Sequence, residues 1–266
     1  MNKHAPRPII ALGDAHGEYH SFAAVLIHAG LMNPELTWTG GKTILIQMGD
    51  ILDRGSDPLH IDRLLDVLQI QARADGGDII RLIGNHELEI LRKNYFITSL
   101  PYFQIEPFRQ KLLRGIEHGR LCAAYSARGF LFTHAGVCDN LFAALKKEVA
   151  PKGKPSPTAF AKHINKVFKE AAKTSNYHHP IFNVSYIRGG SERFGGIFWE
   201  DISSIIHNHA LCPFKQIIGH TTVPNISHSD DGKIIAIDVG MSKVFEGDFE
   251  YLKIKSPKKV TICKVK

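Results

Sequence analysis

The stretch Gly49-Asp50-Ile51-Leu52-Asp53-Arg54-Gly55 follows directly on an apolar run at residues 43–48. The run is short, contains β-branched residues and is bounded by glycines, which is typical of a buried strand. Its carboxyl end carries two carboxylates, one guanidinium and two glycines. In an open α/β sheet, ligands bind at the carboxyl ends of the strands. The stretch therefore predicts an α/β fold with a functional site at the edge of its sheet.

The same pattern recurs elsewhere in the chain, where short apolar runs end in glycine together with Asp, Asn or His. These runs are Ile9–Leu12 with Asp14 and His16, Asp78–Ile83 with Asn85 and His86, Phe130–Phe132 with His134, and Gln216–Ile218 with His220. The first three strand ends are spaced like successive β-α-β units, which implies a parallel core with right-handed crossovers. We therefore expect five strands to bring oxygen and imidazole ligands to one sheet edge.

Helical periodicity separates the expected strands. Apolar stripes predict helices within 18–30, 57–75, 87–94, 108–118, 138–148 and 158–173. The alternating pattern lapses between about 140 and 195, which we interpret as an insertion or lid within a single domain of residues 1–266. Short apolar runs at 216–218, 233–237 and 249–254 predict an antiparallel second sheet.

Composition and cysteine spacing give an expectation for the cellular compartment of the protein. The chain has 266 residues and 44% hydrophobic content, enough to bury a full core. It contains no run of apolar residues long enough for a membrane span, and its first eight residues lack the apolar segment of a secretory leader. The four cysteines show neither paired nor metal-type spacing, so reduced thiols and a cytoplasmic location are expected.

The net charge of +7 is unevenly distributed. Between residues 143 and 173, eight lysines accompany two glutamates, and the tail 253–266 holds six lysines and no acid. Such stretches are usually solvated faces, although they favour acidic partners such as phosphoproteins. They lack interleaved aromatic residues, so nucleic acid is not expected as a partner. The sequence does not specify an oligomeric state.

The polar residues at the strand ends form a mixed oxygen and nitrogen ligand set. Such a set suits borderline divalent ions such as Mn²⁺, Fe²⁺ or Zn²⁺. Asp50 is central in the series and is the natural carboxylate to bridge two metals, an arrangement used for in-line displacement at phosphorus. Two cations neutralise phosphate oxygens and lower the pKa of a bridging water, which supplies hydroxide near neutral pH. The candidate ligands are Asp14, His16, Asp50, Asn85, His134 and His220.

Three further residues are candidates for catalysis. The planar fork of Arg54 can grip phosphate oxygens in a bidentate manner. His86 follows a candidate ligand and can give a proton to the leaving group, and Asp53 is the candidate carboxylate that favours its charged form. Glu87 is predicted to be a structural hydrogen-bond partner in the turn.

The motifs together resemble a known family. Gly-Asp-x-His-Gly at Gly13, Gly-Asp-x-x-Asp-Arg-Gly at Gly49 and Gly-Asn-His-Glu at Gly84, followed by His-x-Gly and Gly-His, resemble the phosphoprotein phosphatase branch of the calcineurin-like metallophosphoesterases. The resemblance implies a four-layer αββα double β-sandwich with a helical insertion. It also implies one metal held by Asp14, His16 and Asp50 and a second held by Asp50, Asn85, His134 and His220. Phosphate contacts from Arg54 and Asn85, with acid catalysis by His86 supported by Asp53, complete the implied site.

Within that branch, His134-Ala135-Gly136 and the ending 237–242 are more similar to bacterial-type, Shewanella-like members than to eukaryotic enzymes. The eukaryotic enzymes usually have a second phosphate-clamping arginine well after a Trp-x-Asp motif. Here no arginine follows Arg193, so the second clamp is Arg188, Arg193 or absent. We favour Arg193, because glycine pairs flank it and let that loop fold close to a ligand.

The expected function is a metal-dependent phosphomonoesterase that dephosphorylates phosphoprotein, at Ser/Thr or Tyr, by in-line attack of a hydroxide held between two metals. One alternative is a hydrolase of dinucleoside polyphosphates, because enzymes of that kind are similar in scaffold. Their bacterial members, however, usually lack the Asp-Arg pair that Asp53 and Arg54 supply here. A nuclease is disfavoured by Thr222, which replaces a second histidine. The alternative from another class is a catalytically silent phosphate-binding module, against which the intact ligand set argues.

Overall fold

The protein is described by a computed structural model that covers residues 7–150, 152–243 and 249–265. A six-stranded sheet has the order β11-β10-β1-β2-β3-β4. Its strands β1 to β4 are parallel, and β10 pairs antiparallel with both β1 and β11. The strands are β1 (Ile9–Leu12), β2 (Ile44–Gln47), β3 (Asp78–Leu82), β4 (Leu121–Cys122), β10 (Glu250–Ser256) and β11 (Lys259–Lys264).

A five-stranded sheet has the order β5-β6-β7-β9-β8. Its strands are β5 (Ala124–Ala127), β6 (Phe130–Thr133), β7 (Lys215–Ile218), β8 (Ser227–His228) and β9 (Ile234–Ala236). The prediction of an antiparallel second sheet was wrong, because β6, β7 and β9 are mutually parallel and only the outer strands β5 and β8 run antiparallel to their neighbours. The run 249–254 was also misplaced, since it forms β10 in the first sheet.

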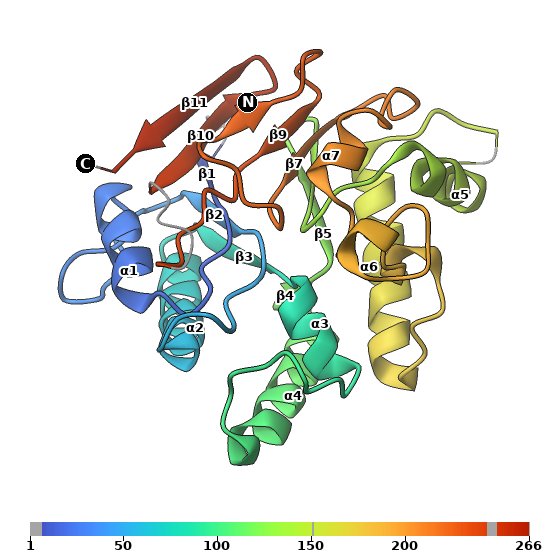
Figure 1. Cartoon of the computed structure of the whole chain (residues 1–266). Coiled ribbons are helices and arrows are strands. Elements are labelled where there is room, and N and C mark those ends of the chain that lie inside the picture. Colours follow the sequence, from blue (N-terminus) through green and yellow to red (C-terminus); the bar gives the residue numbers. More distant parts are fainter. Residues whose placement is uncertain (1–6, 151, 244–248, 266) are drawn as a thin grey trace.

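Helices cover both sheets and complete the predicted mixed α/β layers. Figure 1 shows α1 and α2 beside the first sheet and α5 and α6 on the side of the second sheet. The α-helices are α1 (Tyr19–His28), α2 (Pro58–Ala74), α3 (Asn85–Leu91), α4 (Tyr102–Glu117), α5 (Asp139–Val149), α6 (Pro157–Thr174) and α7 (Ile202–Ile205), with 3₁₀ turns η1 (Pro180–Phe182) and η2 (Tyr186–Arg188). The segment predicted as an insertion therefore holds α5, α6, η1 and η2, and α6 packs on β5 and β6.

Local sequence explains why these elements form. Strands β1, β2 and β6 are buried along their whole length, as expected of parallel strands covered on both faces. Helix α2 begins with Pro58 at its first turn, and the Ser156 hydroxyl caps α6 by accepting from the Ala159 N–H. Helix α4 begins six residues before its predicted start, because its first turn exposes Tyr102 and Phe103 and so shows no apolar stripe.

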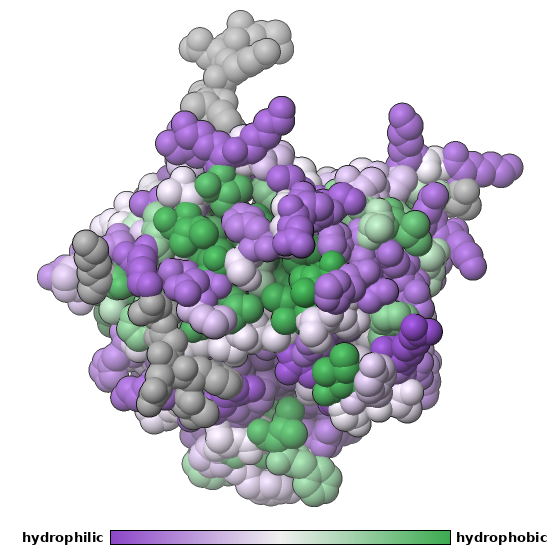
Figure 2. Space-filling model, turned by 45° about the horizontal axis from the view of Figure 1, so that its top comes forward, coloured by the Kyte–Doolittle hydropathy of each residue, from purple (hydrophilic) through white to green (hydrophobic). Residues whose placement is uncertain are grey.

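The surface is largely polar. In the view of Figure 2, hydrophilic residues surround separate patches of hydrophobic ones. Among the described residues, no helix combines the length and the apolar character that crossing a bilayer requires. All four cysteines are free.

The two sheets together position the site. The loops that follow β1, β2 and β3 belong to the first sheet, whereas those that follow β6 and β7 belong to the second. The expectation of a single sheet edge was therefore wrong. The loops meet between the sheets: the His220 N–H donates to Asp14 Oδ2 at 3.1 Å, and His134 Nδ1 lies 2.9 Å from the Met48 carbonyl oxygen.

Candidate metal centre

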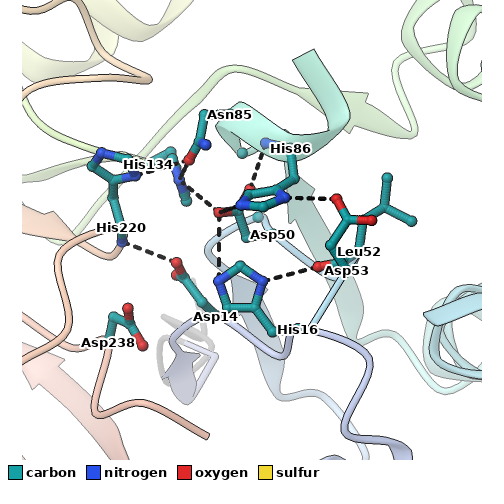
Figure 3. Close-up of polar contacts among 12 residues, drawn as sticks. Asp14, His16, Asp50, Leu52, Asp53, Asn85, His86, His134, His220 and Asp238 are labelled. Carbon is teal, nitrogen blue, oxygen red and sulfur yellow. Dashed lines mark hydrogen bonds and ion pairs between the residues drawn. The ribbon is translucent and has the colours of Figure 1, made fainter. Parts of the chain in front are cut away.

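Asp50 lies at the centre of the cluster that the strand-end loops form (Figure 3). Its Oδ2 atom lies 3.7 Å from His16 Nε2 and 3.4 Å from His134 Nε2. Two groups of possible ligand atoms share this carboxylate, one with His16 and His86 and the other with His134 and His220, and within each group the atoms lie within 4.8 Å of one another. The Asp50 carboxylate is therefore common to both groups of possible ligands.

Asn85 and Asp14 complete the arrangement on either side of Asp50. The Asn85 Oδ1 atom lies 2.9 Å from His134 Nε2 and 2.8 Å from His220 Nδ1. Asp14 lies on the side of His16 in Figure 3. The structure thus brings all six predicted metal ligands together, from two different sheets.

Glu87 fixes the loop that carries Asp50. Its Oε2 atom accepts hydrogen bonds from the backbone N–H groups of Asp50 and Gly84, both at 2.9 Å. Its Oε1 atom accepts from the N–H groups of Ile51 at 3.0 Å and Leu52 at 3.1 Å. Burial and the Asp50 charge raise the pKa of Glu87 to about 7. Glu87 is therefore a structural hydrogen-bond partner in the turn, as predicted.

Several site residues adopt a left-handed backbone conformation. The φ angles are 43° for His16, 50° for Asp50, 63° for Asp53, 67° for Arg54 and 66° for His220. Such conformations are costly for residues other than glycine and persist where the surrounding structure enforces them. Their concentration here indicates that the fold holds these side chains in place at some energetic cost.

Two glycines allow the loops to approach the carboxylates. A Cβ atom at Gly84 would collide with Oδ1 of Asp50, and one at Gly219 would collide with Oδ1 of Asp14. Both positions follow strands, β3 and β7 respectively. Any larger residue there would displace a carboxylate that the site needs.

The donor atoms fit divalent cations. Asp14 Oδ1 and His220 Nε2 are buried, and neither finds a hydrogen-bond partner among the described residues. The Nδ1 atoms of His16 and His134 each lie 2.9 Å from a backbone carbonyl oxygen, of Leu52 and Met48 respectively. A proton on Nδ1 that donates to the carbonyl leaves the Nε2 lone pair free for a metal, which is the usual outer-shell arrangement of metal-bound histidine.

The electrostatics point the same way. Burial and the neighbouring carboxylates of Asp238 and Asp50 raise the pKa of Asp14 well above its ordinary value, and a bound cation would oppose both effects. Burial would also raise the pKa of Asp50, but the adjacent imidazoles of His134 and His86 hold it well below its usual range. Burial lowers the pKa of His16 to about 4, which leaves its ring neutral and able to bind a metal. Burial also lowers the pKa of His220 well below its ordinary value, so this ring too is available to a metal. Burial would lower the pKa of His134 as well, but the Asp50 charge raises it, so a metal bound at His134 would have to displace a proton.

His86 is held at the rim of this cluster by Asp53. The Oδ2 atom of Asp53 lies 2.6 Å from His86 Nδ1, and Oδ1 accepts hydrogen bonds from the Ser99 N–H at 2.6 Å and the Thr98 hydroxyl at 3.0 Å. Burial alone would lower the pKa of His86, but the Asp50 charge and the Asp53 contact raise it. Thr98 and Ser99 were not predicted, because they lie in an irregular loop and carry no motif.

The two candidate arginines take different positions. Arg188 Nη2 lies 2.8 Å from Asp201 Oδ2 and 2.5 Å from the hydroxyl of Thr221. Thr221 is the residue directly after His220. Burial, the His134 charge and the Arg188 charge, in decreasing order of effect, lower the pKa of His220 well below its ordinary value. Arg193 is exposed, with its guanidinium 5.2 Å from the centre of the Phe194 ring. The geometry therefore favours Arg188 over Arg193 as the second clamp.

Arg54 and Asp238 border the site. Arg54 is exposed, and its charge contributes to the lowered pKa of His16, so the guanidinium lies near the cluster. Asp238 follows β9, and its Oδ1 accepts a hydrogen bond from the Gly240 N–H at 3.0 Å. It is also buried close to Asp14 and contributes to the raised pKa of Asp14.

With this geometry in view, comparison with known proteins identifies the family. A model of the calcineurin-like phosphoesterase family matches residues 7–237. The chain belongs to this family. Calcineurin-like phosphoesterases hydrolyse phosphoesters with divalent metals, and the matched range contains every candidate ligand in the cluster described above.

Individual relatives agree with this assignment. The Shewanella-like protein phosphatase 2 of Arabidopsis thaliana is 37% identical over 103 residues, which cover 38% of this chain and 26% of that protein. The match thus spans about a quarter of the relative. A cold-active protein-tyrosine phosphatase of a psychrophile Shewanella sp. has the same fold, with a TM-score of 0.66, 17% identity, and coverage of 98% of this chain and 80% of that one. A protein serine/threonine phosphatase from Saccharomyces cerevisiae gives a TM-score of 0.57 at 15% identity, covering 100% and 81% of the two chains.

Proposed function

We propose that this calcineurin-like phosphoesterase is a dinuclear-metal phosphomonoesterase that dephosphorylates phosphoproteins. The observation that carries the proposal is the position of the Asp53–His86 pair beside the ligand cluster. The His86 Nε2 atom lies 4.0 Å from Asp50 Oδ2, so the imidazole borders the place where a phosphate would bind (Figure 3). The relatives named as protein phosphatases support a phosphoprotein as the substrate.

The six ligands would hold two divalent ions, with Asp50 shared between them. Mn²⁺ is the ion we favour, with Fe or Zn as alternatives, because the donors are carboxylate, amide and imidazole without thiolate. When bound, the metals would neutralise phosphate oxygens and lower the pKa of a water. Asp14 and His16 would serve one ion, and Asn85, His134 and His220 the other.

His86 is proposed as the general acid. A leaving alkoxide or phenolate needs a proton. Burial would lower the pKa of His86, but the Asp50 charge and the Asp53 contact raise it and so favour the protonated ring. Asp53 positions the ring through Nδ1, and the Thr98 and Ser99 contacts in turn hold Asp53. This leaves Nε2 to donate toward the leaving group.

Arginines would hold the phosphate oxygens that face away from the metals. Arg54 is proposed for one side, with the Asn85 amide as a further contact. Arg188 is proposed for the other side, because it lies beside His220 and Thr221. Arg193 was the favoured candidate from sequence, but its exposed position over Phe194 gives it no comparable contact with the cluster.

The segment of about 140–195 is proposed to be an insertion within a single metallophosphoesterase domain. It packs on the second sheet through α6 and ends near Trp199, whose ring lies 5.7 Å from that of His220. Arg188 belongs to this segment and donates to the hydroxyl of Thr221, the residue after His220. The insertion would thus supply part of the substrate site as well as covering the sheet.

A substrate panel tests the proposal. Phosphoserine, phosphothreonine and phosphotyrosine peptides, para-nitrophenyl phosphate and diadenosine tetraphosphate would be compared with Mn²⁺ added to the full chain. We expect the highest kcat/KM for one of the phosphopeptides. A clear preference for diadenosine tetraphosphate would identify a polyphosphate hydrolase instead. Phosphate binding without turnover of any substrate would identify a silent module.

A further inference from the structure

A second group of possible ligand atoms lies outside the catalytic cluster. Glu148 belongs to α5, His163 belongs to α6, and His179 precedes η1. His163 Nε2 lies 2.6 Å from Glu148 Oε2, and His179 Nε2 lies 3.3 Å from both carboxylate oxygens. One ligand atom from each residue lies within 4.8 Å of the others. Three segments that are separate in sequence therefore converge on one carboxylate.

The ligand types in this group favour Zn²⁺ over Mg²⁺ and Ca²⁺. Two imidazoles and one carboxylate form a common ligand set for Zn²⁺, whereas Mg²⁺ and Ca²⁺ prefer oxygen ligands alone. Ligand atoms around a tetrahedral ion at about 2.0–2.1 Å lie about 3.4 Å apart, so modest side-chain rotation would close the group around one ion. The histidine side chains are each 22% exposed and that of Glu148 is 39% exposed, which leaves a fourth position for water.

The surroundings of Glu148 make this arrangement unusual for a solvated face. Glu148 is one of only two acidic residues among eight lysines between positions 143 and 173. Its carboxylate nevertheless contacts two imidazole nitrogens through the atoms that would bind a metal. Without an ion, each contact needs a proton on Nε2, and a bound cation would take the place of both protons.

The ring of His179 carries one opposing interaction. Its Nδ1 atom accepts a hydrogen bond from the Ile181 N–H at 3.3 Å. Binding a metal through Nε2 would move the ring proton to Nδ1 and break this contact. Because a hydrogen bond at 3.3 Å is at the long end of the normal range, its loss opposes metal binding only weakly.

We propose that Glu148, His163 and His179 form a structural site for a divalent transition metal of the Zn²⁺ class, separate from the catalytic centre. The ion would fasten α5 and α6 to the segment that begins at His179. That segment leads through η2 to Arg188 and Trp199 beside His220. The site would therefore stabilise the insertion that we propose to carry the second phosphate clamp. The metal site itself does not depend on the proposed phosphatase activity.

Zinc content and thermal stability test the site directly. The full chain, stripped with a chelator and equilibrated with zinc, would be compared with His163→Ala/His179→Ala by elemental analysis. We expect the double variant to bind one zinc ion fewer per chain. Zinc should also raise Tm by several degrees in the wild type and by clearly less in the variant. His178→Ala is the matched control, because it removes the adjacent exposed imidazole and should keep wild-type values.

Glu148→Gln serves as a second variant in case the double histidine variant does not fold, because it keeps the shape of the side chain and removes only its charge. It should also lower zinc content by close to one ion per chain while the far-ultraviolet spectrum stays unchanged. Repeating the comparison in an Asp50→Asn background, which disables the catalytic centre, should preserve the same difference. Equal zinc content and equal Tm shifts in the wild type and both variants would overturn the proposal, whatever the substrate panel shows.

Discussion

The Oδ2 atom of Asp53 lies 2.6 Å from Nδ1 of His86, although the two residues are 33 positions apart in the chain. Asp53 comes from the loop after β2, and His86 lies in the first turn of α3. The contact orients the imidazole so that its other nitrogen faces the ligand cluster (Figure 3). Such a carboxylate–imidazole pair both fixes the ring and favours its protonated form.

His86→Asn should remove the proton donor and leave the metal ligands in place. We expect kcat to fall roughly 10²–10⁴-fold for alkyl phosphates and phosphopeptides, whose leaving groups need a proton. Activated aryl phosphates should lose much less, since their leaving groups depart as stable anions. Steady-state kinetics on both substrate types, with metal content measured in parallel, checks this. Equal losses on both would rule out the acid role.

Asp50→Asn should abolish turnover and leave the fold intact. Loss of the shared charge weakens both metal positions, so bound manganese should fall below about one ion per chain. Asn tolerates the left-handed conformation found at Asp50, where φ is 50°, and the backbone should therefore keep its course. Elemental analysis and circular dichroism provide the test. A folded variant with two metals and a near-normal rate would contradict the shared-carboxylate arrangement.

Arg188→Ala should weaken phosphate binding, whereas Arg193→Ala should not. Loss of a charge-assisted contact costs about 1.5–3 kcal/mol, which corresponds to roughly a ten- to hundredfold lower kcat/KM. Inhibition by phosphate or vanadate should weaken in parallel, with unchanged metal content. Arg193→Ala is the matched control, because its side chain is exposed over Phe194. Wild-type kcat/KM in Arg188→Ala would show that the site works without this clamp.

Glu87→Gln should destabilise the loop that carries Asp50. The carboxylate accepts from four backbone N–H groups, two on each oxygen, and a glutamine can satisfy only the two that face its carbonyl. Each buried N–H left unpaired costs about 1–3 kcal/mol, so the free energy of unfolding should fall by at least that amount. Urea denaturation checks this, with the exposed Glu117→Gln as control. Equal stability of the two variants would show that Glu87 does not hold the turn.

Arg81→Ala should be strongly destabilising, although it lies far from the proposed chemistry. Arg81 on β3 contacts Asp62 of α2 at 2.5 Å, both side chains are only 5% exposed, and Lys111 of α4 completes the pairing. Removing one partner of a buried pair costs up to about 3–5 kcal/mol, and here Asp62 would be left buried with only Lys111 as its partner. Arg73→Ala, which breaks the more exposed pair with Asp78, should cost no more than about 1 kcal/mol.

The same network sets a pH dependence. Burial would raise the pKa of Asp62, but the charges of Arg81 and Lys111 lower it below its ordinary value. Its stabilising contribution is therefore fully present above the unfolded-state pKa of about 3.9 and is lost as the pH falls through the folded-state pKa. Urea denaturation of the wild type and Asp62→Asn from pH 7 to pH 3 checks this. The stability advantage of the wild type should shrink only below about pH 4.

The sequence by itself determined the local features of this protein. Short apolar runs that end in glycine and Asp, Asn or His specify both the strand and the candidate ligand at its end, because both are encoded within a few residues. The structural role of Glu87 was predictable for the same reason. Glu87 lies three residues after Gly84 and accepts a hydrogen bond from the Gly84 N–H. The apolar stripes located α1 to α6, although α4 begins earlier with exposed aromatic residues, and the short helix α7 was not predicted.

Only the tertiary structure decided which strands share a sheet and which side chains reach the site. Pairing depends on contacts between distant segments, so the sequence could not show that β10 joins β1 or that β6, β7 and β9 are parallel. The reach of an arginine depends on the path of its loop, and flanking glycines favoured Arg193 whereas the folded segment directs Arg188 to Thr221. The support of Asp53 by Thr98 and Ser99 likewise arises from packing between loops. Local patterns thus fix the chemistry that each segment carries, and long-range packing fixes the geometry in which that chemistry meets.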